Sequence, residues 1–174
     1  MRVIAGRYGG RRLTTPKGAD TRPTADRVRE ALFSALGDVS GLTALDLFAG
    51  SGALGIEALS RGAASAVFVE RAAPALAALR ANLDALGTTA VVHKGDARTF
   101  LRNASRAGRT YDLVFVDPPY RDAERLGDEL DLGSVLAADG RLVTESDRRS
   151  PLATDLPTLF ERRYGDTLIR IHGH

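Results

Sequence analysis

Cysteine is absent from this chain of 174 residues. Its absence excludes disulfide bonds, thiolate metal sites and catalysis by a cysteine nucleophile, and it fits a reducing compartment. The chain also lacks the ~20 consecutive apolar residues of a membrane span, and residues 1–7 contain no apolar stretch typical of a signal sequence. We therefore expect a cytoplasmic protein. Only three histidines are present, and their spacing does not indicate a metal site, so we expect no metal.

The chain has little net charge, +2, but its positive charge is concentrated at the N-terminus. Residues 1–30 contain eight basic and three acidic side chains, whereas residues 31–174 contain 16 basic and 19 acidic ones. Such clustering is typical of a segment that contacts a polyanion such as nucleic acid, although a merely solvated face gives the same pattern. The basic residues of this segment are Arg2, Arg7, Arg11, Arg12, Lys17, Arg22, Arg27 and Arg29.

Two kinds of local pattern occur in the N-terminal part of the chain. Residues 2–14 are expected to form a short β-hairpin with a glycine-rich turn. After a linker, apolar residues recur at helical spacing over residues 28–36, and Thr24 is the expected N-cap of this helix. The helix would leave Arg27 and Arg29 pointing outward.

From residue 43 onward, strand and helix patterns alternate, which is typical of parallel βαβ units. The last two strand patterns straddle Gly165-Asp166, a two-residue turn typical of an antiparallel hairpin. We therefore expect an α/β fold with a Rossmann-like, mostly parallel sheet and a C-terminal antiparallel hairpin over residues 21–174, preceded by a basic arm over residues 1–20. The expected strands cover residues 43–47, 66–69, 90–93, 113–116, 141–145, 159–164 and 167–172. One expected helix follows the glycine-rich turn and ends at residue 61. Further helices are expected over residues 74–86 and 97–106, and a weaker helical pattern covers residues 122–138.

A glycine-rich turn follows the first of these strands. Residues 50–55 read Gly-Ser-Gly-Ala-Leu-Gly between a strand and a helix, where small residues let a ligand approach the backbone. A dinucleotide, a nucleoside or no ligand at all would be consistent with this turn alone. Glu70, at the end of the second strand, favours a ligand because an acid there accepts hydrogen bonds from both hydroxyl groups of a ribose. Adenosine is therefore the expected common part of that ligand.

Two further acids lie near this turn. Asp46 is expected to be buried in the first strand and therefore needs a cationic partner or several donors, which a methionine-type ammonium or the N–H groups of the turn would supply. Asp96 follows the third strand, where it would either face the edge of an adenine or cap the next helix. The sequence leaves both pairs of alternatives open.

A second motif, Asp117-Pro118-Pro119-Tyr120, follows the apolar strand of residues 113–116. Prolines have no N–H group, so the segment presents acceptors only, namely the Asp117 carboxylate and the Pro118 carbonyl. Two acceptors can hold one planar amino group, and Tyr120 offers a face on which a base taken out of its stack can lie. A proline-rich turn with a capping acid is the structural alternative. With the glycine-rich turn, the motif favours chemistry on the amino group of a base.

The two motifs together resemble those of the class I S-adenosylmethionine-dependent methyltransferases that act on amino groups. Residues 2–6, residues 10–11 and, above all, residues 22–33 (Arg-Pro-Thr-Ala-Asp-Arg-Val-Arg-Glu-Ala-Leu-Phe) extend this similarity to the bacterial RsmD family. That family methylates N2 of one guanine in 16S ribosomal RNA of the small ribosomal subunit. The similarity runs from residue 1 to about residue 145, and it implies a class I methyltransferase fold.

The resemblance also implies roles for particular residues. Asp117, Pro118, Pro119 and Tyr120 would hold the target amine, and Arg22 and Thr24 would lie near the mouth of the active site. The implied cofactor is S-adenosylmethionine. It would be held by Asp46, Phe48, Ala49, Gly50, Ser51, Gly52, Gly55, Glu70, Asp96 and Ala97. The expected partner is 16S ribosomal RNA within a small-subunit particle, contacted by the basic residues named above, and the protein is expected to act as a monomer.

Three other functions share part of this pattern. A DNA adenine-N6 methyltransferase shares the Asp-Pro-Pro-Tyr motif, but such enzymes usually need an additional region that recognises the target. A nicotinamide-dependent dehydrogenase shares the glycine-rich turn and Glu70, but it would leave the Asp-Pro-Pro-Tyr motif without a task. A non-enzymatic RNA-binding module would explain only the basic segment.

Overall fold

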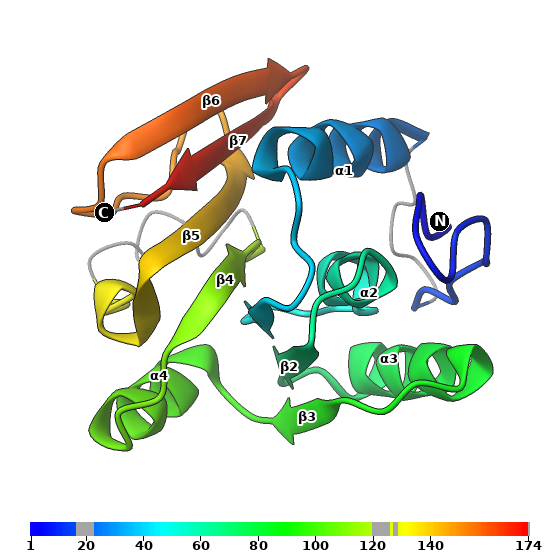
Figure 1. Ribbon diagram of the computed structural model, residues 1–174. Coiled ribbons are helices and arrows are strands. Elements are labelled where there is room, and N and C mark those ends of the chain that lie inside the picture. Colours follow the sequence, from blue (N-terminus) through cyan, green and yellow to red (C-terminus); the bar gives the residue numbers. More distant parts are fainter. Residues whose placement is uncertain (17–22, 120–125, 127–128, 174) are drawn as a thin grey trace.

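A seven-stranded sheet with the order β3-β2-β1-β4-β5-β7-β6 forms the centre of the molecule (Figure 1). The structure is a computed structural model that describes residues 1–16, 23–119, 126 and 129–173. Its strands are β1 (Thr43–Asp46), β2 (Ser65–Glu70), β3 (Val91–Lys94), β4 (Tyr111–Val116), β5 (Leu136–Asp147), β6 (Thr158–Tyr164) and β7 (Thr167–His172). Its helices are α1 (Pro23–Leu36), α2 (Ala53–Ser60), α3 (Ala73–Leu86) and α4 (Ala97–Arg106), with a 3-10 turn η1 (Gly133–Val135).

Strands β1 to β5 run parallel, and β7 is antiparallel to both β5 and β6. The chain proceeds outward from β1 through β2 to β3 and then returns to the other side of β1 with β4. The order of the strands therefore reverses between β1 and β4, and ligands of open α/β sheets bind at the carboxyl ends of the strands at such a point.

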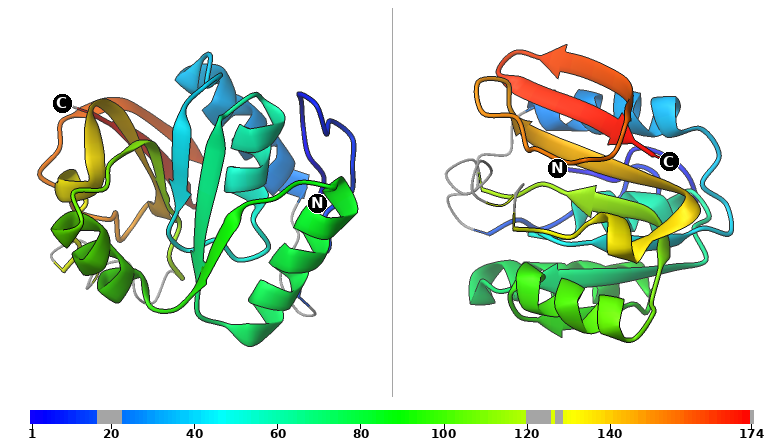
Figure 2. Two further views of the ribbon diagram at one scale, coloured as in Figure 1. Left: turned by 60° about the horizontal axis from the view of Figure 1, so that its bottom comes forward. Right: turned by 90° about the vertical axis from the view of Figure 1, so that its left-hand side faces the viewer.

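Helices lie on both faces of the sheet (Figure 2), and a hydrophobic cluster fills the space on each face. Helices α1, α2 and α3 and the N-terminal arm lie on one face, where the ring of Phe33 packs 5.9 Å from that of Phe115 and close to Phe68. Helix α4 and the chain around η1 and Leu152 lie on the other face. In the part of the chain that the structure describes, no helix is long and apolar enough to cross a lipid bilayer.

The predicted fold class is confirmed, including the C-terminal antiparallel hairpin. Helix α4 and strand β7 occupy the predicted residues, and most other boundaries differ from the predicted ones by one or two residues. The starts of α1 and β5 were predicted wrongly. Helix α1 begins at Pro23, so Thr24 lies within its first turn and is not the N-cap. Strand β5 begins at Leu136, where the end of a weak helix was predicted.

Local sequence hides the start of β5 because residues 137–140 read Ala-Ala-Asp-Gly, which is typical of a turn rather than a strand. The chain stays extended there, and its pairing with β4 shifts register between Tyr111 and Leu113. A β-bulge of this kind lets a strand continue past residues that do not alternate. Of the rest of the predicted helix, residues 122–125 and 127–128 lie outside the described residues, and residues 133–135 form the 3-10 turn η1.

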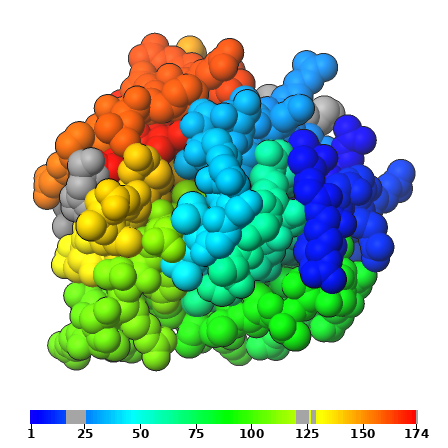
Figure 3. Space-filling model, viewed as in Figure 1, coloured from blue at the N-terminus to red at the C-terminus, as the bar shows by residue number. Residues whose placement is uncertain are grey.

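Residues 1–16 form an arm that packs against α2 and α3 (Figure 3). The predicted hairpin is reduced to one antiparallel bridge between Arg2 and Arg12. Val3, Tyr8 and Leu13 are buried in the same cluster as α1 and α2. Burial of three apolar side chains ties the arm to the core of the molecule.

Side chains of α2 and α3 also hold the backbone of the arm. Glu57 accepts hydrogen bonds from the N–H groups of Ile4 (2.7 Å) and Ala5 (3.1 Å), and the hydroxyl of Ser60 accepts one from Tyr8 N–H at 2.9 Å. The Asn82 amide both accepts from and donates to the backbone of Thr14. These contacts satisfy backbone groups that no strand partner serves.

The prediction that Arg29 points outward from α1 is wrong, because its side chain is only 4% exposed. Its guanidinium donates hydrogen bonds to the Arg2 carbonyl and, at 3.0 Å, to the Asp26 carboxylate, and its Nε lies 3.6 Å from Glu57 Oε2. A buried guanidinium is tolerated only with such partners. Arg27 is exposed, as predicted.

Candidate active site

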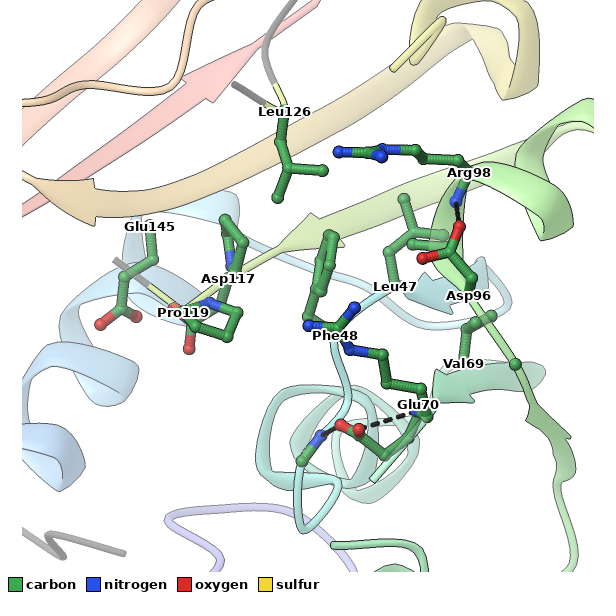
Figure 4. A pocket seen from close by; sticks show the side chains of 15 residues that line it. Leu47, Phe48, Val69, Glu70, Asp96, Arg98, Asp117, Pro119, Leu126 and Glu145 are labelled. Atoms are coloured by element: carbon green, nitrogen blue, oxygen red, sulfur yellow. Dashed lines mark hydrogen bonds between the residues drawn. The ribbon is translucent and has the colours of Figure 1, made fainter. Parts of the chain in front are cut away.

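A cavity of about 870 Å³ opens at the carboxyl ends of β1, β2, β3, β4 and β5 (Figure 4). This volume lies within the range of ~300–1,000 Å³ that is typical of small-molecule sites. Among the described residues its lining is Leu47, Phe48, Gly50, Val69, Glu70, Arg71, Gly95, Asp96, Ala97, Arg98, Asp117, Pro118, Pro119, Leu126 and Glu145. The cavity therefore brings the glycine-rich turn, Glu70, Asp96 and the Asp-Pro-Pro motif together, as the strand order requires.

Glu70 joins the end of β2 to the glycine-rich turn. One carboxylate oxygen accepts a hydrogen bond from Gly50 N–H at 2.8 Å, and the other accepts from the N–H groups of Arg71 (2.8 Å) and Ala72 (2.7 Å). A carboxylate has about four acceptor positions, so these three bonds fix its orientation and leave it able to accept another. The sequence predicted this residue as the ribose acceptor, and that role remains a prediction.

The glycines of the turn fall into two groups. Gly50 has a φ of 55°, and a Cβ built on it would meet no atom within 4 Å, so the space beside it is open to the cavity. Added Cβ atoms would lie 2.4 Å from Leu79 Cδ1 at Gly52 and 2.3 Å from Phe68 Cε1 at Gly55. Gly55 is thus explained by close packing of α2 on the sheet, and Gly52 by close packing against α3 and by its positive φ of 86°.

Asp46 is 2% exposed, and its carboxylate accepts a hydrogen bond from Gly55 N–H at 3.0 Å. Burial, with a smaller contribution from the charge of Glu70, raises the pKa of Asp46 to about 7, although the Gly55 bond opposes the rise. The turn therefore supplies one of the two partners that the sequence left open. Asp46 is not among the described residues that line the cavity.

The other residues of the turn also lie behind the cavity wall. Ala49 and Ser51 are buried, and the carbonyl of Ser51 accepts a hydrogen bond from the Asn82 amide at 2.9 Å. Phe48, by contrast, is part of the lining.

Asp96 caps α4 and lines the cavity. Its carboxylate accepts hydrogen bonds from the N–H groups of Arg98 (3.0 Å) and Thr99 (3.3 Å), which makes it the N-cap of the helix. The side chain is exposed, and the following residue, Ala97, is buried and also lines the cavity. The capping alternative is confirmed, and contact with an adenine edge stays a prediction.

Asp117 and Pro119 lie at the opposite end of the cavity from Asp96 (Figure 4), and Pro118 also lines the cavity. Pro118 is buried, Pro119 is exposed, and Tyr120 lies outside the described residues. Burial and the neighbouring charges of Glu145 and Asp46 raise the pKa of Asp117 well above its usual value. No hydrogen bond or ion pair holds the Asp117 carboxyl group within the described residues. Among the described residues, it is thus an acceptor without a hydrogen-bond partner.

Glu145 is the site residue that sequence reasoning missed. It was recognised only as the end of a strand, yet it lies beside Asp117 in the cavity (Figure 4). Burial raises its pKa, and the charge of Arg29 opposes this rise. The available signal was positional, because Glu70 and Asp117 are also acids at the carboxyl end of a parallel strand.

The basic residues predicted to contact RNA are not equivalent. Arg2, Arg7, Arg11, Arg12 and Arg27 are exposed, whereas Lys17 and Arg22 lie outside the described residues. Among the exposed ones, Arg2 lies 3.5 Å from Asp26, and Arg11 donates a hydrogen bond to the carbonyl of Ala85 at 2.8 Å. Exposure leaves all five accessible to a polyanion. Arg29 is inaccessible to one, because it is enclosed by its partners.

Comparisons with known proteins agree with this geometry. A family model described as "Conserved hypothetical protein 95" matches residues 1–172. Ribosomal RNA small subunit methyltransferase D of Escherichia coli (strain K12) is 40% identical over 161 residues, which cover 88% of this chain and 78% of that protein. The chain belongs to the RsmD family.

Two further relatives span nearly its whole length. YlbH of Bacillus subtilis (strain 168) is 39% identical over 180 residues, covering 99% of this chain and 98% of that protein. The structure of a hypothetical protein from Thermus thermophilus is 32% identical and superposes with a TM-score of 0.85 over 100% of this chain and 99% of that one. The fold is that of the class I methyltransferases.

Proposed function

We propose that this member of the RsmD family transfers a methyl group from S-adenosylmethionine to the exocyclic N2 amine of a guanine in 16S ribosomal RNA. The observation that carries the proposal is the shared cavity, in which Asp117 and Pro118 lie with Glu70 and Gly50. Support for ribosomal RNA as the substrate comes from the name of the E. coli relative. Support for the amine comes from the chemistry of Asp117 and Pro118.

The charges of the cavity fit S-adenosylmethionine. Among the described lining residues, the acids are Glu70, Asp96, Asp117 and Glu145, and the arginines are Arg71 and Arg98, of which Arg98 is paired with Glu129. A net negative lining favours a ligand that carries a sulfonium and an ammonium group. The same lining disfavours the pyrophosphate of a dinucleotide, and the Gly50 N–H group that would face it already donates to Glu70.

Particular residues would hold the cofactor. Glu70 would accept hydrogen bonds from its ribose, Gly50 would allow close approach to the backbone, and Phe48, Val69 and Ala97 would surround the adenine with apolar surface. When bound, S-adenosylmethionine supplies an activated methyl group on a positively charged sulfur. Asp46 would contribute through the turn, because its carboxylate fixes Gly55 at the start of α2.

Asp117 and the Pro118 carbonyl would hold the two hydrogens of the target amine. Two acceptors in this geometry orient the amine, and orientation of two reactants accounts for ~7–11 kcal/mol of barrier lowering in favourable cases. Positive charge develops on the amine nitrogen during transfer, and acceptors already aimed at it stabilise the transition state more than the ground state. After transfer, the methylated nitrogen is strongly acidic and loses its proton to water, so the proposal requires no strong general base.

Transfer of a labelled methyl group tests the proposal. The protein is incubated with S-adenosylmethionine labelled in its methyl group and, in parallel, with naked 16S ribosomal RNA, small subunits from cells that lack the family enzyme, and duplex DNA. Digestion to nucleosides is expected to place the label on N2-methylguanosine from one of the two ribosomal substrates. Label on N6-methyladenosine from DNA would overturn the choice of substrate, and label on no nucleic acid would overturn the proposal.

A further inference from the structure

Glu145 and Asp117 leave the sheet side by side. In the register of the parallel strands β4 and β5, Val116 pairs with Thr144, so the next residue of each strand is one of the two acids. Figure 4 shows both side chains at one end of the pocket, next to Pro119 and away from Asp96 and Glu70. Both residues line the cavity, and neither carboxyl group takes part in a hydrogen bond or ion pair within the described residues. A molecule in this end of the cavity would therefore meet two carboxyl groups at once.

The bases differ in what they present beside an exocyclic amine. In guanine the N2 amine lies between N1–H, which is a donor, and N3, which is an acceptor, so on its N1 side the amine and the ring nitrogen beside it are both donors. In adenine and cytosine the amine lies next to an unprotonated ring nitrogen, which is an acceptor. A carboxylate at this second position attracts the guanine edge and repels the lone pair of the other two bases.

We propose that Glu145 is the residue that selects guanine, by accepting the N1–H of the base whose N2 amine is held by Asp117 and Pro118. This inference rests on the function proposed above and adds to it the group that distinguishes guanine from the other amino bases. Asp117 and Pro118 alone would hold the amine of adenine or cytosine equally well, because each of those amines also has two hydrogens. Glu145 is thus a specificity residue that contacts the substrate.

The electrostatics of the pair support this division of roles. Burial raises the pKa of both acids, and the charge of Glu145 raises that of Asp117 further, whereas Arg29 opposes the rise only for Glu145. Arg29 therefore favours the ionised form of Glu145, and an ionised carboxylate accepts hydrogen bonds without donating one. A base edge that offers donors to both groups reduces their repulsion, and an edge with an acceptor in the second position does not.

The test uses 2-aminopurine, which has the same N2 amine as guanine but an unprotonated N1. Once the modified guanine has been located, 16S ribosomal RNA is prepared with guanine or 2-aminopurine at that position and offered to the wild type, Glu145→Gln and Glu30→Gln. Glu30 is exposed on α1 and serves as the matched control. The measured quantity is the ratio of kcat/KM for the two RNAs, which is internal to each variant and therefore insensitive to loss of folded protein.

The wild type and Glu30→Gln are expected to prefer guanine by about 10- to 100-fold, the range typical of discrimination by a well-placed hydrogen-bonding group. In Glu145→Gln this preference is expected to nearly disappear, because the amide can donate to the unprotonated N1 as readily as it accepts from N1–H. If Glu145→Gln is inactive on both RNAs, the same ratio is measured as the ratio of the two RNA dissociation constants.

Each outcome separates the two claims. An unchanged preference for guanine in Glu145→Gln would overturn the role of Glu145 while leaving the proposed function intact. A wild-type protein that labels no guanine N2 in any ribosomal substrate would overturn both. Loss of the preference in Glu145→Gln together with its retention in Glu30→Gln would support the inference.

Discussion

Two groups of acids in this protein differ in how their charge is satisfied. Glu57, on α2, is fully buried and accepts hydrogen bonds from two N–H groups of the arm and, at 2.7 Å, from Arg61 Nε. Asp117 and Glu145, at the carboxyl ends of β4 and β5, have no such bond within the described residues, and their pKa values are raised. The difference separates an acid that holds the fold together from a pair of acids available to a ligand.

Glu57, whose carboxylate has hydrogen-bond partners, should contribute to the stability of the fold. Replacing Glu57 by Ala is expected to reduce the free energy of unfolding by about 3–5 kcal/mol, the range typical of removing one partner of a buried ion pair. The loss arises because the substitution removes the Glu57 carboxylate from groups that stay buried. These groups are Arg29, which is 4% exposed, and the N–H groups of Ile4 and Ala5. Urea denaturation measures the effect, and Glu30→Ala, at an exposed position of α1, is the matched control. Equal stability of the two variants would contradict the structural role assigned to Glu57.

Asp117, whose carboxyl group has no hydrogen-bond partner among the described residues, should contribute to methyl transfer instead. Replacing Asp117 by Ala is expected to lower kcat for methyl transfer by about 10²–10³-fold, by analogy with removal of one oxyanion-hole donor. Stability should not fall with it, because no described partner loses a hydrogen bond. Affinity for S-adenosylmethionine, measured by calorimetry, should stay nearly unchanged, as it should in the exposed control Asp84→Ala. Comparable loss of transfer and of cofactor affinity would assign Asp117 to cofactor binding instead.

Asp46 lies between these two extremes, with one hydrogen bond and a pKa of about 7. Between the ordinary pKa of 3.8 and this value, the folded protein holds a proton that the unfolded chain has lost, so stability falls as pH rises through this window. Each unit of pKa difference corresponds to ~1.4 kcal/mol, which sets the upper limit of the slope per pH unit.

Asp46→Asn should remove this contribution to the pH dependence. The variant is expected to gain stability relative to the wild type on going from pH 5 to pH 8, while the amide oxygen still accepts from Gly55 N–H. Unfolding free energies of both proteins at the two pH values measure the difference. An identical pH dependence in wild type and variant would show that the Asp46 carboxyl group is not protonated in the folded state at pH 5.

The smallest effect is expected at the surface of the arm. Replacing the exposed Arg12 by Ala should weaken RNA binding and reduce the slope of log affinity against log salt concentration by about one unit for a lost phosphate contact. Arg106, an exposed arginine in the last turn of α4, provides the control Arg106→Ala. If the salt dependence of RNA affinity changes by the same amount in Arg12→Ala and Arg106→Ala, or changes in neither variant, the arm is not part of the RNA interface.

Much of the site could be predicted because each of its acids ends a strand, and strand ends of a parallel sheet meet at one edge. Glu70, Asp96 and Asp117 were recognised in this way, and all three line one cavity. Glu145 satisfies the same positional rule, because the strand predicted over residues 141–145 ends on it, but no motif accompanies it, so the sequence assigns it no role.

The buried charges could not be predicted from local pattern. Arg29 lies beside apolar positions of α1, and its burial depends on Glu57, which is 28 positions further along the chain. The sequence predicts the charge of the arm and a hairpin within it, whereas the attachment of the arm depends on hydrogen bonds such as that from Ile4 to Glu57, across 53 positions. Contacts of this separation are set by tertiary packing, which overrides local propensity.

A crystal structure of the protein with S-adenosylhomocysteine would test most directly whether the unsatisfied acids face the reacting centre. The adenosine is expected to lie between Glu70 and Asp96, with its sulfur turned toward Asp117 and Glu145 across a gap that one base can fill. A sulfur atom directed away from these two acids, or a distance to the Asp117 carboxyl too long for one nucleobase to span, would contradict the proposed mechanism.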